Sequence, residues 1–332
     1  MRGAPKYVIW IFTAACNLDC LHCYAKRFRG LPELPLGEKL RIARDLGESG
    51  VEYVNLTGGE PLIHPHLEHI LGELSERGVE TSVVTNATAV SDRAASLLGR
   101  TGTYAYVSIE GPREVHDKIR GEGTFERAMA GLRKLLGSAL GVSVVTTVNK
   151  LNADRIEEAV DVVADLGVEE MAVIPVMPSG RAAETKIYVG PEEYARALVA
   201  AHRKARERGI RLSTWCTPWA PLLIGDLEGG SFCRAMVGFD VDPAGDVLLC
   251  DVLDFRITTL RGKGVREAFT EFRQHWLVRA VMEPGFLPRW CASCPLRASC
   301  AGGCFARAYL ARGGLNAGDP LCPRAANVRA AP

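Results

Sequence analysis

The sequence predicts an α/β protein built on a parallel sheet, and three observations lead to this fold class. Apolar, β-rich runs alternate with amphipathic helical stretches over residues 1–175. The links between them resemble right-handed crossovers, which place successive strands in parallel. After Pro191 the pattern changes to a helix followed by a cysteine-rich region. The change predicts two domains, and we place their boundary near Ile210, giving domains 1–210 and 211–332.

The elements follow from hydrophobic periodicity. Strands are predicted at residues 7–13, 53–57, 80–85, 103–109, 141–148 and 170–175. Helices are predicted at residues 36–49, 91–98, 124–136 and 153–166, and, after the change of pattern, at about 192–208 and 265–277. A hairpin is predicted at residues 239–250, around the turn sequence Asp242-Pro243-Ala244-Gly245.

Six strand–helix units are too few for a closed eight-stranded barrel, so they leave an open doubly wound sheet or a partial barrel. In both folds the chemistry collects at the carboxyl ends of the strands. The short polar motifs of this chain fall there: a cysteine loop after the first strand, Gly58-Gly59-Glu60-Pro61 after the second, Asn86 after the third, and Ser108 with Glu110 at the end of the fourth.

Charge and composition exclude several classes of protein. The chain has 332 residues with 40 basic and 39 acidic side chains, a net charge of +1, which offers no electrostatic reason to bind nucleic acid. No apolar run approaches the roughly 18 residues needed to span a bilayer, and we identify no signal peptide. The 11 cysteines are an odd number, so they cannot all form internal disulfides. We therefore expect a cytoplasmic protein with reduced thiols.

The first cysteine group, Cys16, Cys20 and Cys23, offers three thiolates within eight residues. Three ligands would leave one iron of a four-iron cluster open to an outside ligand. The alternatives are a structural zinc loop that borrows a fourth ligand such as His22, and a set of thiols that bind no metal.

The spacing of Cys16, Cys20 and Cys23, together with the motif from Gly58 to Pro61, resembles the radical S-adenosylmethionine (radical SAM) superfamily. The resemblance implies a partial (β/α)6, TIM-like barrel. It also implies that S-adenosylmethionine chelates the open iron, with its amino group received by the segment from Gly58 to Glu60. Glycine suits that place, because a ligand must approach the backbone closely.

The same resemblance implies further contacts to S-adenosylmethionine. His22 stands where relatives carry an aromatic residue near the adenine. Candidates for the ribose and the methionyl carboxylate are Ser108, Glu110, Asn86, Arg120 and Asn149. Arg120 and Asn149 have an ordinary alternative role, on the surface or as caps.

A second resemblance, to the SPASM domain, is based on seven cysteines: Cys233, Cys250, Cys291, Cys294, Cys300, Cys304 and Cys322. It implies two auxiliary [4Fe–4S] clusters, three in all with the first. The outer one would be held by Cys291, Cys294, Cys300 and Cys322, and the inner one by Cys233, Cys250 and Cys304. Cys216 is either the fourth inner ligand or a buried thiol that leaves that iron open. The alternative for residues 291–304 is a zinc ribbon.

The chemistry implied is that of an oxygen-sensitive, anaerobic oxidoreductase. Reductive cleavage of S-adenosylmethionine yields a 5′-deoxyadenosyl radical that takes a hydrogen atom from the substrate, and the auxiliary clusters oxidise the substrate radical. An external donor of the ferredoxin or flavodoxin type supplies the electron. Asp251 follows Cys250 as the base proposed in sulfatase-maturating relatives does, or makes local hydrogen bonds only.

The substrate stays open between a small molecule and a peptide. Residues 177–182, 302–309 and 319–322 resemble relatives that act on tetrapyrrole side chains in the alternative haem pathway, by oxidative decarboxylation, and relatives linked to tungsten cofactors. Only six residues precede the first strand, which favours a substrate other than a leader-bearing peptide. The alternatives are a peptide- or protein-modifying maturase and, more remotely, a zinc-binding structural protein or an electron-transfer protein. An arginine-lined pocket would indicate a porphyrin, and a groove would indicate a peptide.

Overall fold

The computed structural model describes residues 3–225, 238–282 and 287–326. One ten-stranded sheet runs through it in the order β10-β9-β8-β1-β2-β3-β4-β5-β6-β7. Strands β1 to β7 pair in parallel, β8 pairs in parallel with the other side of β1, and β9 and β10 are antiparallel. The strands are β1 (Tyr7–Thr13), β2 (Tyr53–Gly58), β3 (Glu80–Thr85), β4 (Tyr104–Ser108), β5 (Val142–Val148), β6 (Glu170–Pro175), β7 (Arg211–Thr214), β8 (Gly238–Val241), β9 (Asp246–Leu248) and β10 (Arg256–Thr259).

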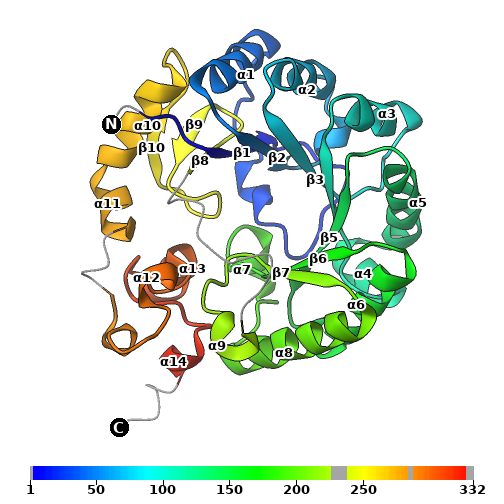
Figure 1. The fold of residues 1–332 in the computed structure, drawn as a ribbon, viewed down its shortest axis with the longest axis vertical. Helices are drawn as coiled ribbons and strands as arrows, with labels where there is room; N and C mark the ends of the chain where they lie inside the picture. Colours follow the sequence, from blue (N-terminus) through cyan, green and yellow to red (C-terminus); the bar gives the residue numbers. More distant parts are fainter. Residues whose placement is uncertain (1–2, 226–237, 283–286, 327–332) are drawn as a thin grey trace.

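The strand order decides between the two predicted architectures. A doubly wound sheet reverses its strand order at a switch point, whereas β1 to β7 follow one another without reversal. Right-handed crossovers that all advance in one direction put their helices on one face. Figure 1 shows these helices outside the curved sheet, so the partial barrel is confirmed. They are α1 (Leu36–Ser49), α2 (Leu67–Ser75), α3 (Asp92–Arg100), α4 (Arg113–Arg120), α5 (Thr124–Leu136), α6 (Ile156–Asp165) and α8 (Pro191–Arg208).

The alternation of side chains along β1 explains how the core and the mouth of the barrel are separated. Val8, Trp10 and Phe12 are fully buried in the core cluster that includes the helical residues Ile42 and Leu46, while Ile9 faces the inner cavity. A period of two is what a strand with different faces requires. The barrel therefore has an apolar outer layer and an interior left for function.

Most predicted elements are confirmed, and the differences have local causes. Strands β1, β3 and β6 and helices α1 and α5 match the predicted ranges residue for residue. The helix predicted at 153–166 begins with the 3₁₀ turn η3 (Ala153–Arg155). The helix predicted at 265–277 ends as α10 (Val265–Gln274), because His275 is extended, and α11 (Trp276–Met282) follows.

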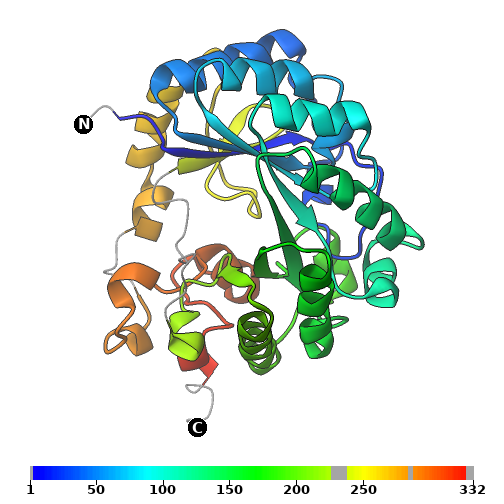
Figure 2. The same ribbon diagram turned by 45° about the vertical axis from the view of Figure 1, so that its right-hand side comes forward.

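The C-terminal segments continue the barrel. The hairpin β8–β9 is confirmed, and the Asp242 carboxylate accepts from the Ala244 and Asp246 amides within its turn. Strands β7 and β8, both beyond Ile210, join the same sheet as β1 to β6, so the domain boundary stays a prediction. Figure 1 and Figure 2 show the last helices beside the open side of the sheet. The short elements are η1 (Ala25–Phe28), η2 (Pro61–Ile63), α7 (Arg181–Thr185), α9 (Pro221–Ile224), η6 (Arg289–Cys291), α12 (Arg297–Cys300), α13 (Phe305–Arg312) and α14 (Pro323–Ala326). Among the described helices, none has the length and apolar character to cross a membrane.

Candidate active site at the carboxyl ends of the strands

One cavity of about 210 Å³ lies in the mouth of the barrel and is lined by cysteines from both groups. The six are Cys16, Cys20, Cys23, Cys216, Cys250 and Cys304. Six predicted S-adenosylmethionine contacts also line it: Gly58, Gly59, His22, Asn86, Ser108 and Arg120. The fold thus brings residues separated by almost the whole chain to one place.

The cysteine loop after β1 packs against the backbone of Gly58 and Gly59 at the end of β2. Gly58 has φ of 117°, and a side chain at Gly59 would put its Cβ 1.9 Å from the carbonyl oxygen of Ala15. The Gly59 amide donates to the Thr13 carbonyl at 2.7 Å, and the Glu60 amide donates to the Ala15 carbonyl at 2.8 Å. Glycine is required because two backbones touch here, which is a physical reason for the motif.

The first three thiols fit an iron–sulfur cluster better than zinc. None of the ten described cysteines is in a disulfide. Among the described residues, these three are not a group whose ligand atoms all lie within 4.8 Å of one another. Tetrahedral zinc, with Zn–S bonds of about 2.3 Å, needs sulfurs about 3.8 Å apart. Burial raises the pKa of Cys20 to about 11, against the opposing charge of Arg120, so ionised thiolates need a positive group among them.

Glu110 holds two basic side chains that line the cavity, His22 and Arg120. Its Oε1 accepts from Arg120 Nε at 2.8 Å and Nη2 at 2.5 Å and contacts His22 Nε2 at 2.8 Å, and its Oε2 accepts from the Thr147 amide at 3.0 Å. Burial would raise the pKa of Glu110, but the charges of Arg120 and His22 outweigh it and hold the pKa at about 2. Glu110 itself is fully buried and is not among the cavity-lining residues.

This network directs two side chains at the cavity. His22 Nδ1 is buried without a hydrogen-bond partner among the described residues. Arg120 Nη1 lies 3.9 Å from Cys20 Sγ. Arg120 therefore belongs to the site rather than to the surface.

Three other residues predicted to contact S-adenosylmethionine, Glu60, Pro61 and Asn149, lie outside the lining of the cavity. The Glu60 carboxylate accepts from Thr85 Oγ1, the Leu62 amide and the Asn86 amide at 2.7–3.0 Å, so it joins the ends of β2 and β3. Pro61 is the first residue of η2. Asn149 is buried in a turn where its side chain accepts from the Leu151 amide and donates to the Thr147 carbonyl. Asn149 thus stabilises this turn through local hydrogen bonds.

Sequence reasoning missed an ion-pair network under the cysteine loop. The Lys39 ammonium is fully buried and donates to Glu33 Oε2 and to the Phe12 carbonyl, each at 3.2 Å. The Glu33 carboxylate accepts from Thr13 Oγ1 at 2.6 Å and the Ala14 amide at 3.0 Å, and it contacts His64 Nε2 at 3.0 Å. The network fixes the backbone that leads into Cys16. The only signal in the sequence was a lysine within the apolar stripe of α1.

The second cysteine group lies across the cavity. The Cys304 thiol makes a side-chain hydrogen bond with Cys216, and this bond lowers the pKa of Cys304. Burial, followed by the charges of Asp251 and Asp240 and that of Cys304, raises the pKa of Cys250. Cys233 lies outside the described residues.

Asp251 also lines the cavity and contacts the residue after the first group. The Tyr24 hydroxyl is hydrogen-bonded to Asp251 and to Thr57, and burial with the charge of Asp251 raises the pKa of Tyr24. Asp251 Oδ1 is 3.6 Å from Cys250 Sγ. Tyr24, which sequence reasoning did not select, therefore spans the gap between the two groups.

The predicted outer group forms a second assembly of thiols. Cys291 is close enough to Cys294 and Cys322 for their charges to raise its pKa, after the larger effect of burial. Burial and Cys322 raise the pKa of Cys300 to about 12. All four belong to the loops and short helices between η6 and α14.

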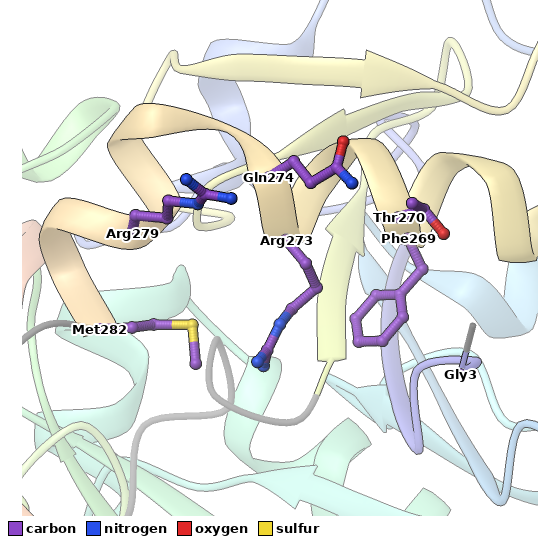
Figure 3. Close-up of a pocket in the computed structure, with 7 residues that line it drawn as sticks. All are labelled: Gly3, Phe269, Thr270, Arg273, Gln274, Arg279 and Met282. Atoms are coloured by element: carbon purple, nitrogen blue, oxygen red, sulfur yellow. The ribbon is translucent and has the colours of Figure 1, made fainter. Parts of the chain in front are cut away.

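A larger hollow of about 580 Å³ lies elsewhere, beside α10 and α11 (Figure 3). Its described lining is mostly from these helices, including Phe269, Arg273, Arg279 and Met282, and holds no cysteine and no strand-end residue. We take the smaller cavity as the candidate active site, because six of the cysteines predicted to bind clusters line it and the pKa values of Cys20 and Cys250 are shifted there.

Comparison with known proteins identifies the family. The sequence model of the Radical SAM superfamily matches residues 10–163. Mycofactocin maturase MftC of Mycobacterium ulcerans is 30% identical, with 96% of this chain and 88% of that one covered. The chain belongs to the radical SAM superfamily. It is an enzyme of this superfamily, whose members use a [4Fe–4S] cluster and S-adenosylmethionine.

Other known proteins match this chain over nearly its whole length. AdoMet-dependent heme synthase of Methanosarcina barkeri is 29% identical over 97% of each chain. Among solved structures, Streptococcus suis SuiB bound to precursor peptide SuiA has a TM-score of 0.77 at 18% identity, covering 97% of this chain and 76% of that one. Native anSMEcpe with bound AdoMet and Cp18Cys peptide has a TM-score of 0.73 at 16% identity, covering 96% and 95%. These two share the fold.

Proposed function

We propose that this radical SAM enzyme oxidises its substrate in the cavity between two cysteine groups. The observation that carries the proposal is that Cys16, Cys20 and Cys23 line the same cavity as Cys216, Cys250 and Cys304. A substrate held there meets the hydrogen-abstracting site on one side and an electron acceptor on the other. When bound, a reduced cluster with S-adenosylmethionine supplies the radical that removes a hydrogen atom, and the auxiliary clusters supply an acceptor for the remaining electron.

The first group, Cys16, Cys20 and Cys23, holds the cluster to which S-adenosylmethionine binds. Gly58 and Gly59 let the methionyl group approach the backbone, and Ser108 and Asn86 supply polar contacts to the ligand. His22, held through Nε2 by Glu110, keeps Nδ1 for the adenine, and Arg120 faces the methionyl carboxylate. These residues orient the ligand and exclude water from it.

The C-terminal domain, residues 211–332, holds two auxiliary clusters. Cys291, Cys294, Cys300 and Cys322 bind the outer one, and the inner one takes Cys250, Cys304 and Cys233. We assign Cys216 as the fourth inner ligand, because its side chain contacts Cys304 and lines the cavity with Cys250. Thiolate-held clusters persist where thiols stay reduced, which supports a cytoplasmic location. The electron comes from an external donor of the ferredoxin or flavodoxin type.

Asp251 is the base that accepts the proton when the substrate radical loses its electron. It lines the cavity, and the Tyr24 hydroxyl donates a hydrogen bond that orients its carboxylate. The electron leaves to the inner cluster and the hydrogen atom to the adenosyl group, so the substrate loses two electrons in total.

For the substrate, we propose a tetrapyrrole or another cofactor precursor whose side chain is oxidised. The end-to-end match with AdoMet-dependent heme synthase supports this class. The lining of the cavity supports the alternative, a peptide: among its described residues Arg120 is the one arginine, and Glu110 already neutralises it. A pocket for several propionates would need further cations.

The test is anaerobic reconstitution followed by metal analysis and an assay for 5′-deoxyadenosine. We expect roughly twelve irons per chain and dithionite-dependent 5′-deoxyadenosine. Replacing Cys16, Cys20 and Cys23 by Ala should abolish the product and leave the auxiliary irons, roughly eight. Cys291→Ala is the matched control, expected to lose iron from the outer cluster only. Fully reconstituted protein that forms no 5′-deoxyadenosine would overturn the proposal. Mass spectrometry of a propionate-bearing iron porphyrin and of a model peptide after turnover then separates the two substrate classes.

A further inference from the structure

A buried ion pair joins helix α13 to the loop before α14. The side chains of Arg307 and Asp319 are 3% and 0% exposed. Arg307 Nε donates to Asp319 Oδ1 at 2.8 Å, and Nη2 donates to Oδ2 at 2.5 Å. A buried, bidentate pair is costly to desolvate, and replacing it by apolar residues often stabilises a protein. Its presence therefore calls for a role besides stability.

Asp319 binds backbone amides at or beside two cysteines that follow α12, Cys304 and Cys322. Its Oδ2 accepts from the Cys304 amide at 3.0 Å and from Trp219 Nε1 at 2.8 Å. Its Oδ1 accepts from the Leu321 amide at 3.0 Å, and its own carbonyl accepts from the Cys322 amide at 3.1 Å. Each carboxylate oxygen thus fixes backbone next to a cysteine.

Arg307 reaches the opposite segment, after β7. Its Nη2 donates to the Cys216 carbonyl at 2.9 Å. Cys216 has φ of 53°, a left-handed conformation that a residue with a Cβ rarely adopts without tertiary support. The Arg307 amide also donates to Cys304 Sγ at 3.4 Å. One residue therefore contacts both cysteines, whose thiols are hydrogen-bonded to each other.

We propose that Arg307 and Asp319 are positioning residues that set Cys216 and Cys304 side by side as ligands of the inner auxiliary cluster. The inference rests on the proposed function for those two cysteines. Arg307 donates hydrogen bonds to the carbonyl of the strained Cys216 and to the sulfur of Cys304. Asp319 orients the Arg307 guanidinium and the Cys304 amide. Because neighbouring charges and hydrogen bonds to the sulfurs set cluster potentials, the pair also tunes the electron acceptor.

The test is a redox titration of the reconstituted full chain, followed by electron paramagnetic resonance. Arg307→Gln removes a positive charge and should lower the midpoint potential of one auxiliary cluster. Asp319→Asn removes a negative charge and should raise it. Arg307→Lys, which keeps the charge, should return the potential toward that of the parent. The cluster at Cys16, Cys20 and Cys23 is the internal reference, and Arg93→Gln, which removes an exposed charge from α3, is the control, with no expected shift.

A purely structural role predicts the same direction for both charge changes, so shifts of opposite sign support the proposal. If a variant loses iron instead, loss of one cluster with the first cluster retained also supports it. Unchanged auxiliary potentials in both Arg307→Gln and Asp319→Asn, or equal shifts in the same direction, would overturn it. If Asp319→Asn does not fold, the comparison of Arg307→Gln with Arg307→Lys decides. A parent chain that holds only the first cluster contradicts the proposed function instead.

Discussion

Two buried carboxylates that follow strands β2 and β4 have different roles, although both are glutamates. Glu60 accepts from two backbone amides and a hydroxyl, and burial raises its pKa. Glu110 faces Arg120 and His22, and their charges overcome the effect of burial and hold its pKa at about 2. Glu60 thus ties two strand ends together, whereas Glu110 is a fixed anion that holds the ligand-facing side chains.

Glu110→Gln should weaken S-adenosylmethionine binding and destabilise the fold. Removing one partner of a buried ion pair costs about 3–5 kcal/mol. The folded pKa of Glu110 lies below the unfolded value of about 4.3, so its contribution is present above about pH 4.3 and is lost as the pH falls through about 2. Denaturant unfolding of both proteins should therefore show a stability difference that is constant from pH 8 to 6 and narrows below about pH 4.

The control is Glu114→Gln, whose parent side chain is 64% exposed in its pair with Arg155. It should change the free energy of unfolding by less than about 0.5 kcal/mol. A Glu110→Gln protein that binds S-adenosylmethionine as the parent does would contradict the assigned role of Glu110.

At the scale of elements, the first site is made by contact between two loops. The loop after β1 carries the cysteines, and the loop after β2 supports it through Gly58 and Gly59. Helix α1 contributes the buried Lys39, whose ammonium pairs with Glu33 and donates to the Phe12 carbonyl at the end of β1. Backbone contacts and a buried charge thus hold the loop that carries the cysteines.

Gly59→Ala should separate the two loops. The new Cβ would lie 1.9 Å from the Ala15 carbonyl oxygen, so the backbone must move. We expect about 1–3 kcal/mol of destabilisation and at least about a tenfold loss of 5′-deoxyadenosine formation. Gly72→Ala in α2, where nothing lies within 4 Å of the added Cβ, is the control and should gain about 0.5–1 kcal/mol. Equal product yields from the two variants would rule out this account of the motif.

The sequence predicted those parts of the site that depend on local spacing. Cys16, Cys20 and Cys23 lie within eight residues, the glycine motif is a run of four residues, and strand ends in a parallel sheet converge by topology. Glu33, His64 and Tyr24 were missed because most of their partners are distant in the chain and leave no periodic signal. Glu33 contacts Thr13 and His64, which are 20 and 31 residues away, and Tyr24 contacts Asp251. Glu110 was predicted to contact the ligand because it follows the fourth strand. Its contacts with His22, Arg120 and the Thr147 amide could not be predicted from the sequence.

At the scale of the whole molecule, the sheet order unites the site. The six predicted strands were enough to define the barrel, because each is a long apolar run with a helix behind it. β7 and β10 were missed, since each has only four residues and neither was marked by a turn motif like the one that revealed the similarly short strands β8 and β9. The pairing of β8 with β1 links residues more than 200 positions apart, and it brings Cys250 to the cavity of Cys16. A contact of that separation leaves no trace in local patterns.

The β8–β1 pairing depends on Gly238, and Gly238→Val should therefore uncouple the two cysteine groups. An added Cβ would lie 1.8 Å from the Tyr7 carbonyl oxygen, opposite Gly238 in the register. We expect the hairpin that carries Cys250 to leave the sheet edge, with loss of iron equivalent to one cluster and retention of the cluster at Cys16, Cys20 and Cys23. Gly37→Val in α1, where the added Cβ meets nothing within 4 Å, should keep all the iron. Iron content and electron paramagnetic resonance measure both outcomes. Full retention of iron by Gly238→Val would show that the inner cluster does not depend on this pairing, because a steric clash of this size cannot be absorbed by side-chain movement alone.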